Sequence, residues 1–384
     1  GDAWGKAWAN SWLNISAEIP EKLRGFEIAL QFDLSCEALI FDNEGIPYYS
    51  LTHGSQFDVR FHKEIFIIPE SMRSNGQIDL WLECTASDFL GLDLDREPYE
   101  PKVRGTWNGT AKKLRLGVYN RQVHQLFFDI AVLFSLVSAL PQKDFRKFRI
   151  LRALNDSLST YREKPENAEA ARKILKPVLE YKAGGSNLTA RAIGHGHIDV
   201  AWLWRARESI RKTARTFASQ LYNIEKYPGY VFGASQPQLY AWLKQYYPKL
   251  FTKVVEQVKS QRWELLGGMW VEADCNLISG EAMIRQFLHG KNYFMDEFGI
   301  EVKMLWLPDV FGYSAAMPQI IKGCGCDWFL TQKISWNRFT RFPFSTFVWR
   351  GIDGTEILTH FPPEDSYNAD MLPNMRLCYG QENF

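Results

Sequence analysis

From about residue 188 onward, short segments with the composition of β-strands alternate with amphipathic helical segments. In one helical segment, Ile210, Phe217 and Ile224 fall on a single apolar stripe at helical spacing. Repeated strand–helix units are typical of a parallel sheet with flanking helices, because each helix returns the chain to the same edge. We therefore predict an α/β domain, β/α barrel-like, over residues 188–384.

Polar residues follow the predicted strands of this domain. They are His195, His197, Asp199, Ser235, Gln236, Glu272, Asp274, Asp309, Gln332, Lys333, His360, Asp365 and Tyr367. Three of the seven histidines lie in these positions. The carboxyl ends of parallel strands share one edge of a sheet, where chemistry gathers, so this distribution predicts a functional site there.

His197 and Asp199 are two residues apart after the predicted strand from Thr189 to Gly194. On an extended backbone both side chains leave the same face, so an imidazole nitrogen and a carboxylate oxygen can reach one cation at about 2 Å each. Asp309 ends a later predicted strand and closes such a site from the opposite side. This pattern predicts a metal-dependent enzyme, although either aspartate can instead cap a following helix.

Two other metal patterns compete at the same place. His195-Gly196-His197 also fits the first strand of metal-dependent amidohydrolases and the start of the metallo-β-lactamase pattern. Val200 stands where the second pattern has its final histidine, and both need more imidazoles than the chain supplies. The sequence has no glycine-rich phosphate loop, which argues against nucleotide chemistry.

The first part of the chain has a different organisation. Residues 1–115 contain short strand-like runs separated by turn clusters, which predicts an all-β sandwich. Residues 116–187 show helical periodicity and predict a helical connector. Tryptophans are frequent in the sandwich, and we interpret them as core aromatics between two sheets rather than as a carbohydrate-binding face. They are Trp4, Trp8, Trp12, Trp81 and Trp107.

Composition limits the partners. The 384 residues include 45 basic and 44 acidic side chains, giving a net charge of +1 without a basic block, so neither nucleic acid nor an anionic membrane is expected. No run of about 18 apolar residues predicts a membrane span. Six scattered cysteines do not resemble a disulfide framework, and Cys324-Gly325-Cys326 has no second pair for a zinc site. Together these features predict a cytoplasmic protein.

Six ordered motifs between residues 188 and 367 resemble those of a known family. They are Gly-His-Gly-His-Ile-Asp-Val-Ala-Trp-Leu-Trp (194–204), Gly-Gly-Met-Trp-Val-Glu-Ala-Asp-Cys-Asn (267–276), Ser-Gly-Glu-Ala-Met-Ile-Arg-Gln-Phe-Leu (279–288), Trp-Leu-Pro-Asp-Val-Phe-Gly-Tyr-Ser-Ala (306–315), Phe-Leu-Thr-Gln-Lys-Ile-Ser-Trp-Asn (329–337) and His-Phe-Pro-Pro-Glu-Asp-Ser-Tyr (360–367). These motifs closely resemble the α-mannosidases of glycoside hydrolase family 38, in particular the cytosolic and vacuolar branch. Residues 5–13 resemble the sandwich domain of that branch more loosely.

The resemblance implies a retaining exo-glycosidase that removes terminal α-mannose from oligosaccharides. Carried over to this chain, it makes His197, Asp199 and Asp309 ligands of one zinc ion, and Asp309 also the nucleophile that forms a mannosyl-enzyme. Cobalt or another divalent ion also suits such ligands. Retention needs a second carboxyl group about 5–5.5 Å away.

The resemblance further implies a stacking wall at Trp202 with Phe311 close by, and a substrate pocket lined by Lys333 and Tyr367. A homo-oligomer is also expected. A metal-dependent amide or ester hydrolase and a non-catalytic carbohydrate-binding protein remain the alternatives.

Two family features do not occur in this sequence. These are the downstream histidine motif that supplies a fourth zinc ligand and the Gly-Asp-Gly-Gly-type loop that carries the acid/base aspartate. We therefore expect the remainder of a longer chain to be a partner of this segment, and residues 1–384 alone to show no mannosidase turnover.

Overall fold

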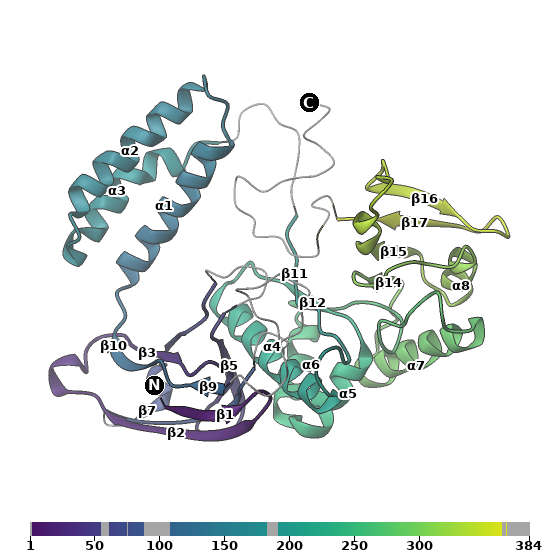
Figure 1. Ribbon diagram of the computed structural model, residues 1–384, viewed down its shortest axis with the longest axis horizontal. Coiled ribbons are helices and arrows are strands. Elements are labelled where there is room, and N and C mark those ends of the chain that lie inside the picture. Colours follow the sequence, from purple (N-terminus) through teal and green to yellow (C-terminus); the bar gives the residue numbers. More distant parts are fainter. Residues whose placement is uncertain are drawn as a thin grey trace. The chain divides into compact units, whose positions relative to one another are not determined.

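The computed structural model describes residues 2–54, 61–74, 76–87, 108–182, 191–362 and 366. The chain divides into two compact units. The first comprises Gly1–Val118, Ile193–Asn337 and Thr346–Phe361, and the second comprises Tyr119–Ala192, Arg338–Ser345 and Pro362–Phe384. Within the first unit, an antiparallel β part precedes an α/β part along the chain (Figure 1).

The β part contains ten strands among the described residues. They are β1 Ala3–Lys6, β2 Asn10–Glu18, β3 Ile28–Asp33, β4 Glu37–Phe41, β5 Pro47–Thr52, β6 Ile65–Ile67, β7 Arg73–Ser74, β8 Gln77–Thr85, β9 Asn108–Thr110 and β10 Lys113–Val118. One sheet has the order β2-β8-β4-β5 with β7 beside β8, a second has the order β10-β3-β6, and β1 pairs with β9. Every one of these pairings is antiparallel.

The alternation along β8 shows why these residues form a sandwich. Ile78, Leu80 and Leu82 are fully buried, whereas the residues between them, such as Asp79 and Trp81, are exposed. A period of two places one face of the strand in the core and the other outside. The buried face joins one apolar cluster with residues of both larger sheets, so the predicted all-β sandwich is confirmed.

The second unit contains three α-helices among its described residues, α1 Arg121–Ala139, α2 Phe145–Tyr161 and α3 Ala168–Leu179. Their shared core includes Leu133, Ile150 and Leu175. By length and composition alone α1 could cross a membrane, but a single such helix is weak evidence because core helices of soluble proteins also qualify. The absence of a membrane partner stays a prediction.

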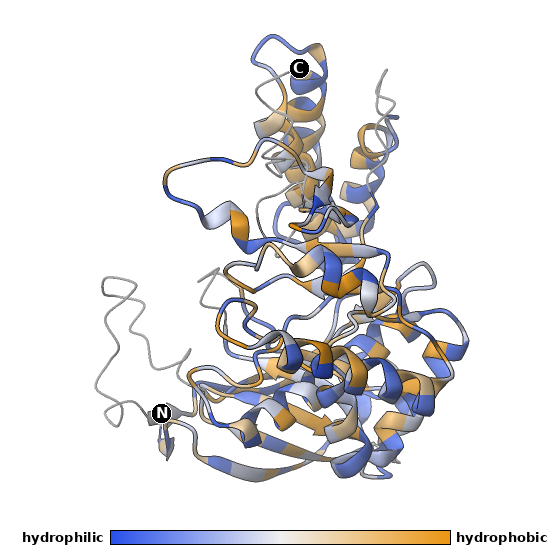
Figure 2. Ribbon diagram, turned by 90° about the vertical axis from the view of Figure 1, so that its right-hand side faces the viewer, coloured by the Kyte–Doolittle hydropathy of each residue, from blue (hydrophilic) through white to orange (hydrophobic). Residues whose placement is uncertain are grey.

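The α/β part alternates strands and helices. Its elements are β11 Gly194–His195, α4 Ala206–Lys226, β12 Phe232–Ala234, α5 Pro237–Tyr246, α6 Pro248–Lys259, β13 Trp263–Leu265, α7 Gly280–Phe298, β14 Met304–Leu307, α8 Met317–Gly323, β15 Trp328–Thr331, β16 Thr346–Arg350 and β17 Glu356–His360. Helix α6 buries Leu250, Phe251, Val254 and Val258, which lie at helical spacing on one stripe. Figure 2 shows hydrophobic and hydrophilic residues alternating along the helices.

The predicted parallel sheet is correct only in part. Strands β11, β12 and β13 form one parallel sheet, and β14, β15 and β17 are parallel in another. However, β16 pairs antiparallel with β17, so the second sheet is mixed. The physical reason is the short connection of residues 351–355, because such a turn can join only antiparallel neighbours. The described strands of the α/β part form two separate sheets rather than a closed barrel.

Charged side chains connect the β part to helix α4. Arg211 Nε donates to Glu83 Oε1 at 2.7 Å, and Lys212 Nζ donates to Glu37 Oε2 at 2.8 Å. Arg215, which is 4% exposed, lies 3.4 Å from the same Glu37 oxygen. These pairs hold α4 against the sandwich within the first unit.

The Glu37 ion pairs make the stability of this contact depend on pH. Burial alone raises the pKa of the Glu37 carboxyl, but the charges of Arg215 and Lys212 outweigh it and lower the pKa to about 2. A depressed folded-state pKa stabilises the protein above the unfolded value of about 4.3, and this contribution is lost as the pH falls toward 2. We expect Glu37→Gln to be less stable than the wild type at pH 7, with a difference that shrinks toward pH 3 in chemical unfolding.

A matched control is Glu281→Gln, which removes an exposed pair with Arg285. It should change stability little at any pH. A difference between Glu37→Gln and wild type that stays constant from pH 7 to pH 3 would contradict this account.

Candidate metal and active site

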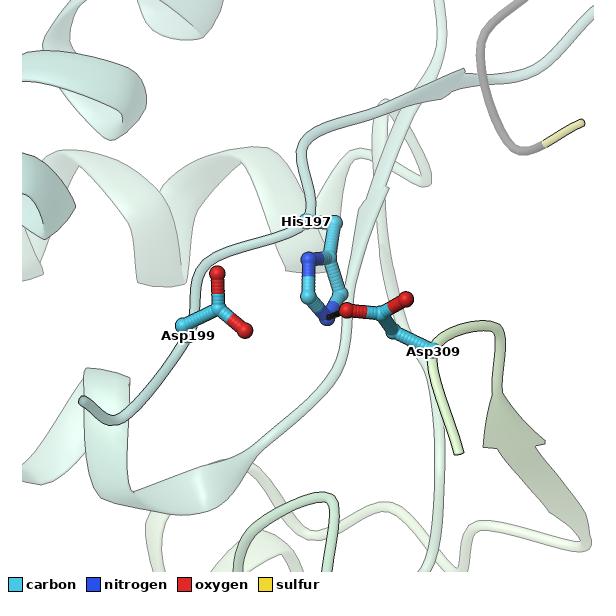
Figure 3. A group of neighbouring side chains, drawn as sticks. All are labelled: His197, Asp199 and Asp309. Carbon is cyan, nitrogen blue, oxygen red and sulfur yellow. Dashed lines mark ion pairs between the residues drawn. The ribbon is translucent and has the colours of Figure 1, made fainter. Parts of the chain in front are cut away.

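His197 and Asp199 lie in the loop that follows β11. Among the described residues the strand comprises Gly194–His195, so it ends one residue later than the predicted segment from Thr189 to Gly194, whose first two residues lie outside the described part of the chain. Ile198, between the two residues, is 5% exposed and belongs to the core of the α/β part. Ile198 is therefore turned into the core, and Figure 3 shows the side chains of His197 and Asp199 facing a common space with Asp309.

Asp309 reaches the same place from the end of β14. Ligand atoms of His197, Asp199 and Asp309 all lie within 4.8 Å of one another. His197 Nε2 is 3.9 Å from Asp309 Oδ2, and Figure 3 shows the Asp309 carboxylate beside the imidazole ring. The structure therefore brings together three side chains that sequence analysis selected from segments more than a hundred residues apart.

Glu272 is a fourth member of this site, which sequence analysis placed after a strand without giving it a role. Its Oε2 lies 3.2 Å from His197 Nε2. Its Oε1 is buried and has no hydrogen-bond partner among the described residues. Burial by itself lowers the pKa of His197, but the negative charges of Glu272, Asp199 and Asp309 outweigh it and raise the pKa to about 9.

Lys333 lies on the other side of Asp309. Its Nζ is 2.6 Å from Asp309 Oδ1 although Lys333 is only 5% exposed. The ammonium group also lies 3.2 Å from the centre of the Trp336 ring and 4.9 Å from that of Phe311. A cation held over aromatic faces needs no water shell on that side, so Lys333 fixes one oxygen of Asp309.

The charges of the site suit a divalent cation. Burial raises the pKa of Asp199, and the charge of Asp309 adds to this effect while the charge of His197 opposes it. One nitrogen and several carboxylate oxygens are a ligand set that zinc accepts, and the buried unpaired Glu272 Oε1 is another acceptor beside it. The residues present therefore fit a metal ion.

His195 does not join this group. Its ring lies 5.2 Å from that of Trp306, and its Nε2 is buried without a hydrogen-bond partner among the described residues. Burial and the neighbouring charge of His197 lower the pKa of His195 to about 3, which keeps it neutral. The rival patterns that use both histidines of His-x-His as ligands therefore gain no support.

Gln236 connects the loop of His197 to that of Glu272. Its Nε2 donates to the Ile198 carbonyl at 2.8 Å, and its Oε1 accepts from the Glu272 backbone N–H at 3.2 Å. The residue is buried and has a positive φ of 66°, a conformation that costs energy outside glycine. Two buried hydrogen bonds offset this cost, so Gln236 positions both candidate loops.

We expect Gln236→Ala to lower metal affinity or activity by about 10- to 100-fold, because outer residues that orient ligands have effects of this size. Gln236→Gly should show the same loss, since it relieves the backbone but still lacks the bridge. Metal affinity measured by competition with a chelating dye, together with hydrolytic rates of the full-length protein, checks this. Gln245→Ala, an exposed change on helix α5, is the control, and equal behaviour of all three variants would refute the bridging role.

The remaining predicted site residues have different surroundings. Trp202 is 53% exposed and lies 6.1 Å from the Trp204 ring, edge to face. Phe311 is 68% exposed and meets Trp336 at 5.8 Å. Tyr367 lies outside the described residues. His360 Nδ1 is 2.8 Å from Thr346 Oγ1, across the β16–β17 pair.

Comparisons with known proteins indicate the family of the chain. The family described as "Glycosyl hydrolases family 38 N-terminal domain" matches residues 187–382, and "Alpha-mannosidase, jelly roll domain" matches residues 1–114. The chain is 36% identical to alpha-mannosidase 2C1 of Homo sapiens over 370 residues, covering 96% of this chain and 35% of the relative. It is 32% identical to an alpha-mannosidase of Saccharomyces cerevisiae over 360 residues, covering 90% of this chain and 32% of the relative.

The chain thus spans about a third of the length of these curated relatives. A solved alpha-mannosidase structure from Enterococcus faecalis V583 is 21% identical and covers 44% of this chain and 19% of its own, with a TM-score of 0.38, too low to add to the fold assignment. The family match extends over half of the sequence and includes His197, Asp199 and Asp309. The chain belongs to glycosyl hydrolase family 38, with a jelly-roll β domain before the catalytic domain.

Proposed function

We propose that the protein is a retaining α-mannosidase that releases terminal α-linked mannose from oligosaccharides. The observation that carries the proposal is the convergence of Asp309 with His197 and Asp199 at the ends of two strands. Membership of a glycosidase family supports the choice of a glycosidic bond as the substrate bond.

The site residues divide into binding and reacting groups. His197, Asp199 and Asp309 would hold a zinc ion, which when bound supplies an electrostatic grip on adjacent sugar hydroxyls. Glu272 and Gln236 hold His197 and its loop in place. Trp202 and Phe311 offer exposed aromatic faces for a sugar ring, and Tyr367 is proposed as a further pocket residue on the resemblance alone.

Asp309 acts as the nucleophile in this proposal. One carboxylate oxygen forms a bond to the anomeric carbon while the bond from that carbon to the leaving oxygen breaks. The leaving oxygen takes a proton from a second carboxylic acid, which later accepts a proton from the water that releases mannose. Lys333, 2.6 Å from Asp309 Oδ1, orients the carboxylate so that its other oxygen faces the sugar.

The stereochemistry of the first product tests the proposal. The full-length protein should hydrolyse p-nitrophenyl α-mannoside, and proton NMR of early time points should show α-mannose before mutarotation. Amide and ester substrates should not react. A β-mannose first product, or hydrolysis of amides without hydrolysis of mannosides, would overturn the assignment.

Removal of metal should abolish the activity. Dialysis against a strong chelator is expected to lower the rate by at least about 100-fold, because the grip on the sugar hydroxyls is lost, and added zinc should restore it. Cobalt is expected to restore part of it. His197→Ala should mimic the depletion, while His289→Ala, an exposed change on α7, should not. Full activity in protein that elemental analysis shows to be metal-free would contradict this prediction.

A cytoplasmic location and a homo-oligomeric state remain predictions. The relatives are alpha-mannosidases by name, and mannose-containing oligosaccharides are our proposal for the substrates of this chain.

A further inference from the structure

We infer that the outer face of the sandwich carries a second, non-catalytic carbohydrate-binding site centred on Trp12 and Trp81. Strands β2 and β8 are antiparallel neighbours in which Trp12 lies opposite Glu83 and Asn14 lies opposite Trp81. Residues opposite one another, and residues two apart on a strand, share a face. Both tryptophans therefore project from the same face as Glu83, which is turned away from the sandwich core and meets Arg211 of α4 at Glu83.

These tryptophans are not core residues, which corrects the interpretation favoured by the sequence. Trp12 is 56% exposed and Trp81 is 50% exposed. The core positions of the two strands are instead taken by aliphatic side chains, such as Ile15 and Leu80. Large exposed aromatic rings cost solvation free energy, and grouped ones mark binding surfaces.

The two rings line a hollow rather than a flat surface. It has a volume of about 610 Å³, which is within the size range of small-molecule sites. Its lining consists of Trp12, Phe41, Asp42, Asn43, Gly45, Met72, Gln77, Asp79 and Trp81. Three aromatic rings are thus combined with two carboxylates and two amides.

Contacts within the lining fix these groups before any ligand arrives. The Trp12 ring lies 5.0 Å from the Phe41 ring at an interplanar angle of 41°. Asn14 Nδ2 donates to Asp79 Oδ1. Asp42 Oδ1 accepts from the backbone N–H groups of Glu44 and Ile46, at 3.0 and 2.8 Å, which holds the β4–β5 turn. A fixed site loses less conformational entropy on binding.

The chemistry of the lining selects the ligand class. Aromatic faces accept the apolar C–H face of a pyranose ring, while carboxylate and amide groups hydrogen-bond its hydroxyls. The lining contains no basic residue, and Lys253 lies 3.9 Å from Asp42 outside it. Anionic ligands such as phosphates are therefore disfavoured, and a wholly apolar partner would leave the carboxylates desolvated. A neutral oligosaccharide can contact the aromatic rings and also hydrogen-bond the carboxylate and amide groups of the site.

The choice of a manno-oligosaccharide rests on the proposed function, because a second site on a mannosidase would hold the same substrate class. The test uses the full-length protein with Asp309→Asn, so that the sugar is bound without turnover. Calorimetric titration with a linear α-linked mannotriose should reveal two sites per chain. Adding Trp12→Ala and Trp81→Ala to this variant should remove one of the two sites or weaken it at least about tenfold. The same two substitutions in protein that keeps Asp309 should leave the rate of p-nitrophenyl α-mannoside hydrolysis within about twofold of wild type.

Trp328→Ala is the matched control, since Trp328 is 46% exposed on β15 and belongs to neither site. If the double variant does not fold, Gln77→Ala, an exposed single change in the hollow, should still weaken the second site. One site that is insensitive to Trp12 and Trp81 would overturn this inference and leave the proposed function intact. One site that is lost with Trp12 and Trp81 would support the inference and count against the proposed function, and no binding at all would overturn the inference.

Discussion

Replacing Asp309 by asparagine is expected to lower the rate of mannoside hydrolysis by at least about 10⁴-fold, because nucleophile removal eliminates the covalent route. The asparagine carbonyl can still face a cation, so metal content should fall less than activity. Lys333 loses its charged partner at 2.6 Å, but this affects orientation rather than the bond-forming atom. Steady-state rates with p-nitrophenyl α-mannoside, together with elemental analysis, measure both effects.

A small anion can take the place of the missing carboxylate. In Asp309→Ala, azide should restore release of p-nitrophenol and yield a mannosyl azide of inverted configuration. Asp327→Asn, which removes a surface pair with Lys322, is the matched control and should keep wild-type rates. Retention of more than about a tenth of the activity in Asp309→Asn would exclude the nucleophile assignment.

The second large effect concerns stability. Arg215→Met is expected to destabilise the first unit by about 3–5 kcal/mol, because removing one partner of a buried ion pair leaves an uncompensated charge. Arg215 pairs with the buried carboxylate of Glu208, contacts Glu37 at 3.4 Å and donates to Thr85 Oγ1 at 3.2 Å. Its loss therefore affects α4 and the sandwich together. Denaturant unfolding monitored by tryptophan fluorescence measures the change.

Arg285→Met provides the same chemical change at an exposed pair with Glu281 and should cost less than about 1 kcal/mol. Adding Glu208→Gln to Arg215→Met should recover part of the lost stability, because the unpaired charge is then absent. Equal stabilities of Arg215→Met and Arg285→Met would show that the contact between α4 and the sandwich is not sustained by these ion pairs.

Local signals allowed much of the fold to be predicted. Helix α7, Gly280–Phe298, shows such signals at both of its ends. It begins after Ser279, whose side chain accepts from the Ala282 N–H, and ends at Gly299 with a φ of 68°. Both caps are visible in sequence. The antiparallel pairing of β16 was missed, because strand periodicity does not reveal the direction of the partner strand.

A residue of the candidate site could be predicted when it met two conditions: it follows a predicted strand, and its side chain is of a type that binds metal ions. His197, Asp199 and Asp309 satisfied both conditions, and the structure brings them together. Glu272 and Gln236 also follow strands, but their roles depend on contacts between residues far apart in sequence, at 3.2 Å and 2.8 Å. No local pattern encodes such contacts. The exposure of Trp81 could have been predicted from the alternation along β8, which puts it on the same face as Asp79. The residue type alone did not exclude a core position, because a tryptophan in a strand fits either face.

Covalent trapping tests the central claim that Asp309 meets a sugar beside His197 and Asp199. The full-length protein would be incubated with 5-fluoro-mannosyl fluoride, whose intermediate forms faster than it breaks down, and digested for peptide mass spectrometry. We predict a mannosyl adduct on the peptide that contains Asp309, with the modification at that residue. An adduct on a different residue, or none in enzyme that still hydrolyses mannosides, would contradict the account.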